Sequence, residues 1–472
     1  MKLIKQNIRL ITILVCVLLF SLIVYGAYSI TNFGSRWFSS SANNYLRKAK
    51  ANVVAGSIFD RNNVALAATG AEGKRYYHPD ETIRRAMVHV VGDDRNNIAY
   101  GAESFMANYL YAINESYLDR LVQAFQGRQR RGNDIRVSVD SRLAKKAYEV
   151  FPKGKSGAVI VMNYRTGELL NLQSYPSFDP MALTQVDKDN PQKPFWNRAT
   201  KWVSAPGSTF KLITMAAALR ADPQALDRMH ECTGSLPVGD TAITDAGLAV
   251  HGRIDLKKAL AVSCNVVFAQ VALDLGDEAL RREASAFGIG DYFLFSDLVV
   301  ENSVYPSSNR TEKELAWTGP GQSSLQLTPM HMTMIAGAIA NKGVMMEPKL
   351  LLNARSASGE SRYDFMGREY RRALSETQAA ELAQAMRAAV TSGTATRAHI
   401  KGMTVCGKTG SAQIDGQKET NAWFVGFVQE PSLPYVVCVV VEDAGGGGSV
   451  AAPIAGALFK FLRDTSAASQ HQ

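Results

Sequence analysis

The stretch "SAPGSTFK" (residues 204–211) places a serine directly after a Pro-Gly pair and a lysine three positions beyond that serine. It leads into the apolar run "LITMAAAL" (212–219), which predicts a buried helix. If that helix begins at the Pro-Gly turn, Ser208 and Lys211 lie on one face of it and can share a proton. A buried lysine of lowered pKa can then activate the serine hydroxyl as a nucleophile.

Two later motifs strengthen this interpretation, because a Ser-x-x-Lys alone arises about once or twice by chance in a chain of this length. "SCN" (263–265) follows in an apolar run, and "KTGS" (408–411) follows much later. Ser263 can relay a proton, Asn265 can hold a substrate amide, and Lys408 can supply positive charge for a carboxylate. Taken singly, "SCN" could be a helix cap and "KTG" a hairpin turn. Together and in this order, the three motifs are the signature of penicillin-binding proteins and class A β-lactamases.

A rival motif overlaps the third one. "GMTVCGKT" (402–409) matches the phosphate-loop pattern G-x-x-x-x-G-K-T. A phosphate loop needs a helix that begins at the Lys-Thr pair, so that its N–H groups face the phosphates. The following "GSAQIDGQKETNAW" (410–423) predicts a strand and a turn instead, which disfavours a nucleotide site.

The composition is that of an ordinary globular protein, with 46% hydrophobic and 20% charged residues, and the length of 472 residues suggests two to three domains. The net charge of +9 suits an anionic partner such as phospholipid headgroups or an acidic wall polymer. Nucleic acid is disfavoured, since "QGRQRRGND" (126–134) is interpreted as a solvated loop and no basic cluster is interleaved with aromatic residues.

The cysteines and histidines are dispersed along the chain, without the short spacings of a zinc site. We therefore expect no metal and no other cofactor. A disulfide among the cysteines outside the N-terminal apolar segment stays open at this point; these are Cys232, Cys264, Cys406 and Cys438.

The N-terminus predicts a membrane anchor. Residues 10–35, "LITILVCVLLFSLIVYGAYSITNFGS", carry no charge and are long enough to cross a bilayer. A cleaved signal peptide would have a shorter apolar region, and a buried helix of a soluble protein would rarely be this long without a charge. The cationic residues before the span place 1–9 in the cytoplasm and the bulk outside, although Arg36 weakens the charge asymmetry.

Residues 52–155 are interpreted as a separate, non-catalytic N-terminal module. In this module the stretch 80–131 is expected to be largely helical, and 135–140 to form a short strand. A helix is predicted at 141–151, with Ser141 as its cap.

The rest of the chain predicts an α+β fold. Residues 157–176 and 421–443 each have the pattern of a β-hairpin, and 452–464 that of an amphipathic helix. Strands at both ends of a helix-rich region indicate an antiparallel sheet completed by pairing of the chain ends, with helices on its faces. The four glycines at 445–448 are interpreted as a mobile turn.

The three motifs and their surroundings resemble the class B penicillin-binding proteins, the monofunctional, membrane-anchored D,D-transpeptidases of bacterial wall synthesis. The likeness includes "GAVIVMNYRTGELLNLQSYPSFDP" (157–180), "GPGQSSLQLTPMHMTMIAGAIANKG" (319–343) and "CGKTGSAQ" (406–413). It implies the penicillin-binding transpeptidase fold, which serine β-lactamases share, over 156–466, followed by a disordered tail at 467–472. The size is closest to the small members of the class, of the penicillin-binding protein A type.

The resemblance assigns roles to the motif residues. It implies Ser208 as the acylated nucleophile and Lys211 as its base. The second motif would be Ser263 and Asn265, and the substrate-binding strand would comprise Lys408, Thr409, Gly410 and Ser411. The N–H groups of Ser208 and Ser411 would form the oxyanion hole.

The implied reaction is acyl transfer from the D-Ala-D-Ala end of a peptidoglycan stem peptide to an amine of a neighbouring stem peptide. β-Lactams would acylate the same serine. A D,D-carboxypeptidase or a β-lactamase would resolve the ester with water instead, and a β-lactam sensor would use the acylation only to signal. The expected location is the bacterial cell membrane, with a single span, an extracytoplasmic catalytic domain and a glycan-polymerising membrane partner.

Overall fold

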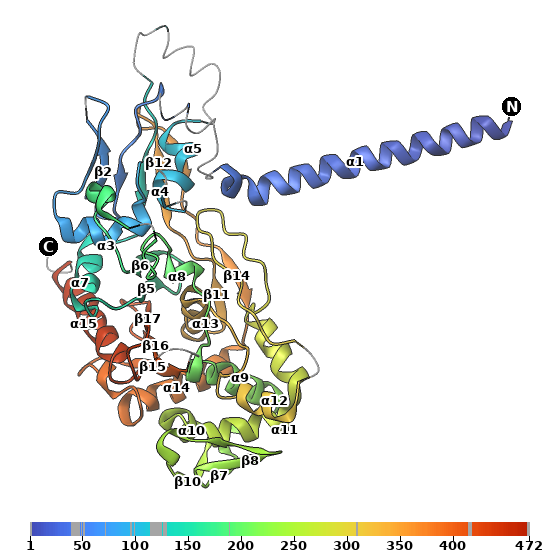
Figure 1. Ribbon diagram of the computed structural model, residues 1–472, viewed down its shortest axis with the longest axis vertical. Coiled ribbons are helices and arrows are strands. Elements are labelled where there is room, and N and C mark those ends of the chain that lie inside the picture. Colours follow the sequence, from blue (N-terminus) through green and yellow to red (C-terminus); the bar gives the residue numbers. More distant parts are fainter. Residues whose placement is uncertain are drawn as a thin grey trace.

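The computed structural model describes residues 2–469 except 39–47, 49, 51, 71, 95–96, 99, 114–124, 126–129, 188, 308–309 and 414–417. A long N-terminal helix lies apart from the rest, a smaller module follows it, and a larger α+β region holds the motifs (Figure 1). The predicted tail 467–472 is partly wrong, because the last helix continues to Ser469; residues 470–472 lie outside the described residues.

A five-stranded antiparallel sheet is the centre of the larger region. Its order is β15 (Val405–Ala412), β16 (Asn421–Val428), β17 (Tyr435–Val441), β5 (Gly157–Asn163) and β6 (Leu169–Tyr175). Both predicted hairpins are therefore confirmed, and β17 pairs with β5 as expected for a sheet closed by the two ends of the region.

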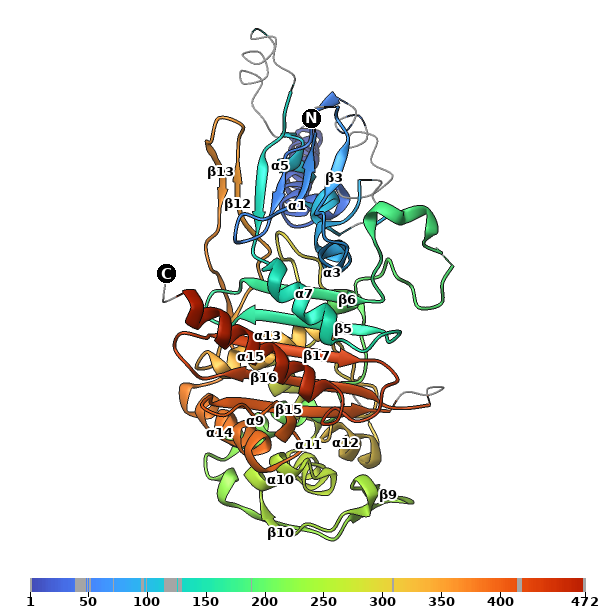
Figure 2. The ribbon, with the colours of Figure 1, turned by 90° about the vertical axis from the view of Figure 1, so that its left-hand side faces the viewer.

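Successive side chains of these strands enter two different cores, because neighbouring residues of a strand point to opposite faces. Val161 packs in the core that includes residues of α7 (Ser141–Val150) and α15 (Ala451–Ser469), while Ile160 packs in the core that includes α13 (Pro329–Ala340). Burial on both faces explains the continuous apolar sequence "YVVCVVV" of β17. Figure 2 shows α15 across one face of the sheet.

The remaining elements of this region surround the site or link these layers. The helices are α8 (Arg198–Lys201), α9 (Lys211–Ala221), α10 (Leu256–Val262), α11 (Asn265–Ala286), α12 (Glu312–Thr318) and α14 (Glu376–Ser392). The 3-10 turns are η1 (Pro180–Gln185), η2 (Gly207–Thr209), η3 (Ala225–Asp227), η4 (Ala246–Leu248) and η5 (Thr396–Ala398). Three two-stranded sheets pair β7 (Met229–Cys232) with β10 (Gly252–Asp255), β8 (Ser235–Val238) with β9 (Thr241–Thr244), and β11 (Val344–Met346) with β14 (Glu369–Arg372).

A second large sheet joins the N-terminal module to the later chain. Its order is β13 (Ser361–Asp364), β12 (Leu351–Arg355), β4 (Asp134–Val137), β1 (Ile58–Phe59), β2 (Ala65–Thr69) and β3 (Arg75–Tyr77). Two of its six strands thus come from residues far beyond the predicted module 52–155. The register of β4 and β12 opposes Ile135 and Ala354, both of which are buried.

In the described residues of the module, the helices that precede α7 are α3 (Glu81–Val91), α4 (Ala102–Phe105) and α5 (Ala107–Leu110). Residues 114–124 of the stretch expected to be helical lie outside the described residues. The expected cap of α7 is wrong. Asp140 accepts hydrogen bonds from the backbone N–H groups of Arg142 and Leu143, whereas the Ser141 hydroxyl donates to the buried Asp60 carboxylate. A carboxylate one position earlier satisfies the first free N–H groups of the helix.

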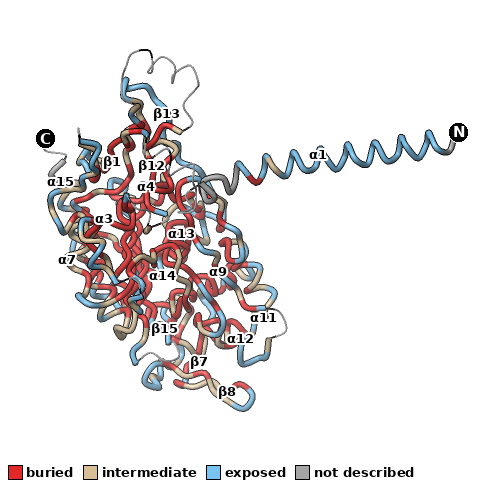
Figure 3. The backbone as a smooth tube through the Cα atoms, turned by 45° about the horizontal axis from the view of Figure 1, so that its top comes forward, coloured by how far each residue is buried: buried red, intermediate tan, exposed pale blue. Residues whose placement is uncertain are grey.

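The N-terminal helix α1 (Lys2–Phe38) includes the predicted span. Its segment Ile4–Ile30 is long and apolar enough to cross a membrane by length and composition. Figure 3 shows the exposure of this helix along most of its length, in contrast to the buried cores of the other regions.

Candidate active site

The nucleophile motif lies on a turn that precedes a buried helix. Ser208 is in the middle of η2 and Lys211 is the first residue of α9, so the helix begins four residues after Gly207. Gly207 has φ +54°, a left-handed conformation that strongly favours glycine. The predicted single helix carrying both residues is therefore wrong, and Ser208 and Lys211 lie on a 3-10 turn and at the start of the helix that follows it.

Strand β15 passes directly against this turn. A Cβ atom on Gly410 would lie 2.9 Å from the Pro206 carbonyl oxygen and 3.2 Å from Cγ2 of Thr209. A Cβ on Gly207 would lie 3.1 Å from the Ser411 carbonyl oxygen. Glycine at both positions therefore permits the close approach of β15 to the nucleophile turn. Because Lys408 and Thr409 lie inside a strand, the phosphate-loop alternative and the hairpin-turn alternative are both wrong.

The second motif occupies the junction of α10 and α11. Ser263 adopts a left-handed conformation, with φ +64°, which costs a non-glycine residue about 1 kcal/mol. Cys264 is the N-cap of α11, and its Sγ accepts a hydrogen bond from the Val267 N–H. The helix-cap interpretation of "SCN" is thus correct for Cys264, while the residues on either side of it face the site.

The two motif lysines meet at Ser263. Lys211 Nζ donates to the Ser263 carbonyl oxygen at 2.5 Å, to Asn265 Oδ1 at 2.8 Å and to Ser263 Oγ at 3.3 Å. Lys408 Nζ donates to the same Oγ at 2.9 Å and to the Thr409 carbonyl oxygen. Among the described residues, no hydrogen bond joins Lys211 to Ser208. Hydrogen bonds of this kind often form only in the substrate complex.

Burial governs the charge state of both lysines, whose side chains are fully buried. Desolvation lowers the pKa of Lys211 to about 7, against the smaller opposing effects of Cys264 and Asp245. Desolvation also holds the pKa of Lys408 well below its usual value, and the charge of Lys211 adds to this effect. Lys211 is therefore able to exchange protons near neutral pH.

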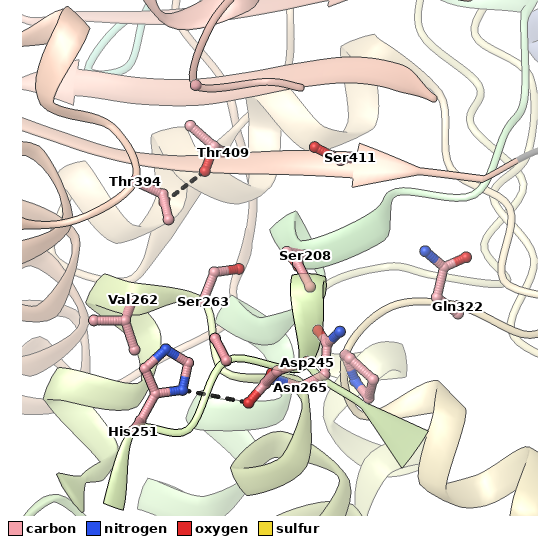
Figure 4. Close-up of a pocket in the computed structure, with 14 residues that line it drawn as sticks. Ser208, Asp245, His251, Val262, Ser263, Asn265, Gln322, Thr394, Thr409 and Ser411 are labelled. Atoms are coloured by element: carbon pink, nitrogen blue, oxygen red, sulfur yellow. Dashed lines mark hydrogen bonds and ion pairs between the residues drawn. The ribbon is translucent and has the colours of Figure 1, made fainter. Parts of the chain in front are cut away.

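A cavity of about 420 Å³ opens at the meeting point of the three motifs. Its lining includes Ser208, Ser263, Asn265, Thr409 and Ser411. Figure 4 shows these side chains converging from β15, the nucleophile turn and the α10–α11 junction. The two lysines are not part of this lining, whose polar groups are hydroxyls, the amides of Asn265 and Gln322, and the side chains of Asp245 and His251.

Sequence reasoning missed several residues of the cavity. The Thr394 hydroxyl, before η5, lies 2.7 Å from the Thr409 hydroxyl, and Gln322 lies beside Ser208 on the loop after α12. Asp245 accepts a hydrogen bond from the Asn265 backbone N–H and so fixes the second motif. The stretch "GPGQSS" (319–324), part of the likeness to the family, contains Gln322, whereas no pattern in the sequence marks Thr394 or Asp245.

A cluster with metal-binding potential lies beside the second motif, and two of its members, Asp245 and His251, line the cavity. The donor atoms of Cys232, Asp245, His251 and Cys264 are all within 4.8 Å of one another. Both thiols are 3.0 Å from Oδ2 of Asp245, and His251 Nδ1 is 3.3 Å from the same oxygen. Two thiols, an imidazole and a carboxylate are a set of four ligands that zinc accepts. The five cysteines of the chain are all free, and no short spacing in the sequence marks this cluster.

Contrary to the expectation of no metal from the residue spacings, we expect this cluster to bind zinc. The full chain, purified in detergent without chelator, should contain about one zinc ion per chain, and His251→Ala should weaken zinc binding at least about tenfold, as expected when a ligand is removed. The measurements are metal analysis by mass spectrometry and competition with a chromogenic chelator. The matched control is His399→Ala, a histidine outside the cluster. Equal zinc content in wild type and His251→Ala would contradict the prediction.

Comparison with known proteins identifies the family. The family model of the penicillin binding protein transpeptidase domain matches residues 157–460. The chain belongs to the penicillin-binding protein transpeptidase family. The matched residues of this penicillin-binding protein contain all three motifs and the five-stranded sheet.

Individual penicillin-binding proteins align with most of the chain. The peptidoglycan D,D-transpeptidase PbpA of Mycobacterium tuberculosis is 31% identical over 369 residues, which cover 72% of this chain and 74% of that protein. PbpA of Mycolicibacterium smegmatis is 31% identical over 363 residues, covering 71% and 73%. The ceftriaxone acyl-enzyme complex of penicillin-binding protein A from M. tuberculosis has a TM-score of 0.78 at 27% identity and covers 87% of this chain and 98% of that chain.

Proposed function

We propose that the chain is a peptidoglycan D,D-transpeptidase that crosslinks stem peptides through an ester on Ser208. The observation that carries this proposal is the convergence of Ser208, Lys211, Ser263, Asn265 and the 408–411 strand on one cavity. Relatives of the same family are peptidoglycan D,D-transpeptidases by name, and penicillin-binding protein A forms acyl-enzyme complexes with β-lactams.

Acylation begins with proton transfer from Ser208. The neutral amine of Lys211 takes the proton, directly or through the Ser263 hydroxyl that contacts it. The serine oxygen attacks the carbonyl between the two D-alanines, and the N–H groups of Ser208 and Ser411 stabilise the oxyanion. The bond to the last D-alanine then breaks, and Ser263 returns the proton to the leaving nitrogen.

Deacylation repeats these steps in reverse with a different amine. An amine of a second stem peptide loses a proton to the same relay and attacks the ester carbonyl, which forms the crosslink and regenerates the Ser208 hydroxyl. Asn265 lies where it can hold an amide of the donor peptide. The hydroxyls of Thr409 and Thr394 contact the terminal carboxylate, while the buried Lys408 orients Ser263 from behind. Gly410 allows β15 to lie against the nucleophile turn.

The proposed topology places the catalytic region outside the cytoplasm. α1 anchors the chain at the bacterial cell membrane by a single span, with residues 1–9 inside, and the module 52–155 holds the catalytic region 156–466 above the surface. A membrane partner that polymerises glycan strands would supply the substrate at this location. These assignments are supported by the apolar helix and the cationic residues before it.

The test measures whether an acceptor amine or water releases the acyl group from Ser208. The full-length protein in detergent receives a synthetic donor ending in D-Ala-D-Ala, with and without an acceptor stem peptide, and products are quantified by mass spectrometry. We expect release of D-alanine and a crosslinked dimer whose yield rises with acceptor concentration. Rapid hydrolysis that is independent of acceptor would contradict the transpeptidase and favour a D,D-carboxypeptidase. A single acylation without turnover would favour a β-lactam sensor.

A further inference from the structure

We propose that the N-terminal module binds the phosphate group of anionic membrane lipids through a cationic patch, which surrounds a cavity near the anchor helix. The patch comprises Lys48, Lys50, Lys74, Arg130 and Arg131. The inference goes beyond the transpeptidase reaction, and it rests on the proposed role of α1 as a membrane anchor. None of the residues of the patch belongs to the three motifs.

Positive charge is concentrated in the part of the chain that follows the predicted span. Residues 36–155 contain 20 lysines and arginines but only 12 aspartates and glutamates, whereas residues 156–472 contain 29 of the former and 31 of the latter. The net charge of +9 therefore arises from the anchor and the module, and not from the catalytic region. A basic surface beside a membrane attracts anionic headgroups.

A cavity of about 610 Å³ opens in the module, and its size suits a lipid headgroup. Its lining comes mainly from the segment after the anchor and from the β2–β3 hairpin. Lys50, Lys74 and Arg75 contribute positive charge to this lining, and Asp94 is the one acidic residue among its described members. Cationic side chains therefore outnumber acidic ones around the cavity.

Arg75 fixes one wall of the cavity. Its Nε donates to the carboxylate of Glu103 in α4 at 2.6 Å, and its Nη1 donates to the Thr69 hydroxyl at 3.0 Å. Both members of the Arg75–Glu103 pair are almost fully buried, so their charges cancel locally. The positive charge that a ligand meets in the cavity therefore comes from Lys50 and Lys74.

Lys50 is the more buried of these two lysines. Its Nζ donates to the Asp94 carbonyl oxygen at 3.1 Å and lies 5.6 Å from the centre of the Tyr111 ring. Burial lowers the pKa of Lys50, against the smaller opposing effects of nearby acidic residues. A phosphate in the cavity would stabilise the charged amine. Lys74 is exposed, so it can contact a headgroup at the mouth of the cavity.

The cavity is connected to the anchor helix through α4. α1 contacts α4, and Figure 1 shows the end of α1 beside α4 and α5. The same short helix α4 carries Glu103, the partner of Arg75 in the cavity wall. Lys48 follows Phe38, the last residue of α1, by only ten positions. The patch therefore lies at the end of the module that is nearest to the proposed bilayer.

Two arginines extend the patch beyond the cavity. The Val54 N–H donates to the Arg130 carbonyl oxygen at 2.9 Å, and the Gly132 N–H donates to the Val54 carbonyl oxygen at 2.8 Å. This pairing holds Arg130 and Arg131 against the segment that lines the cavity. The Arg130 Nε is buried and has no hydrogen-bond partner among the described residues, while Arg131 is about half exposed and pairs with Asp134 at 3.3 Å. Guanidinium groups bind phosphate oxygens well.

The experiment measures lipid preference and maps the site on the full chain. The protein in a neutral detergent is crosslinked to phosphatidylglycerol with a photoreactive headgroup, and unlabelled phosphatidylglycerol or phosphatidylcholine competes. We expect phosphatidylglycerol to compete at least about 20-fold more effectively, because each lysine near an anionic lipid contributes about fivefold. The crosslinked peptides should include residues 48–55 or 69–75. Equal competition by the two lipids, or crosslinks confined to α1, would overturn the proposal.

Charge variants give a second readout. Lys48→Gln/Lys74→Gln removes two exposed charges without shortening the side chains, so the protein should fold, and the lipid preference should fall to about twofold or less. The matched control, Lys258→Gln/Lys401→Gln, removes the same charge at two exposed lysines of the catalytic region and should keep the wild-type preference. An unchanged preference in the first variant would contradict the patch.

A salt wash and penicillin acylation separate this inference from the proposed function. The full chain in phosphatidylcholine vesicles should resist extraction by about 1 M salt, which screens charge but does not release a spanning helix. Its release would overturn the anchor and the patch together, whereas retention without a preference for the anionic lipid would overturn the patch alone. Benzylpenicillin should acylate the wild type and both variants equally. A wild type that prefers the anionic lipid but is not acylated would contradict only the transpeptidase.

Discussion

Replacing Ser208 by alanine should abolish covalent labelling by a fluorescent penicillin and reduce crosslinking by at least about 1000-fold. The reason is that the whole reaction passes through an ester on this oxygen, and the other groups of the cavity act on it. Labelling of the full-length protein, followed by gel fluorescence and peptide mass spectrometry, is the measurement. The modified peptide of the wild type should contain Ser208.

The control for this variant is Ser323→Ala, which removes a hydroxyl from a neighbouring cavity and leaves the motifs intact. Its penicillin labelling should remain close to that of the wild type. Both variants should remain folded, because Ser208 lies on a short turn outside the regular helices. Thermal unfolding of both variants checks this. Undiminished labelling of a folded Ser208→Ala protein would contradict the assignment of the nucleophile.

The rate of acylation should fall about tenfold for each pH unit below pH 7 and level off above it. Lys211 can take a proton only in its neutral form, and burial lowers its pKa to about 7. Below that pH Lys211 is protonated and cannot act as the base, so the rate of acylation falls as the pH falls. The measurement is the second-order rate constant for acylation by a chromogenic cephalosporin between pH 5 and pH 9.

Lys211→Met tests whether this amine causes the pH dependence. The variant keeps the length of the side chain in a fully buried position but removes the base, so acylation should slow by about 100- to 10,000-fold and lose its rise near pH 7. Lys258→Met, at an exposed lysine of α10, is the matched control and should retain both rate and profile. A preserved rise near pH 7 in a folded Lys211→Met protein would assign the titration to another group.

The sheet and the positions of the three motifs could be predicted from the sequence, because each has a local signature. The hairpins around β5–β6 and β16–β17 appear as apolar runs separated by turn residues, and the serine-lysine pair appears as a fixed spacing after Pro-Gly. Side chains that meet only through tertiary packing have no such signature. Thr394 reaches Thr409 and Cys232 reaches Cys264 only after helices and strands distant in sequence have packed together.

The burial and the contacts of the motif lysines could not be predicted from the local sequence either. A lysine in a strand motif suggests a cation that binds a carboxylate directly, but Lys408 is fully buried and contacts Ser263. Its burial depends on the packing of β15 against the nucleophile turn and the α10–α11 junction. The N-cap of α7 also depends on a tertiary contact. Ser141 and Asp140 both suit an N-cap in the sequence, and the hydrogen bond of Ser141 to Asp60 decides between them.

The mixed sheet of the N-terminal module constrains the order of folding. β4 needs β12 as a neighbour, and the Ser138 hydroxyl donates to the carbonyl oxygen of Lys349, 211 positions later in the chain. During synthesis, the edge of β4 that pairs with β12 therefore stays unpaired until most of the catalytic region has been translated. Such long-range pairing slows folding and leaves the edge open to aggregation in the meantime. Fragments that end before residue 351 should accordingly be poor candidates for independent expression.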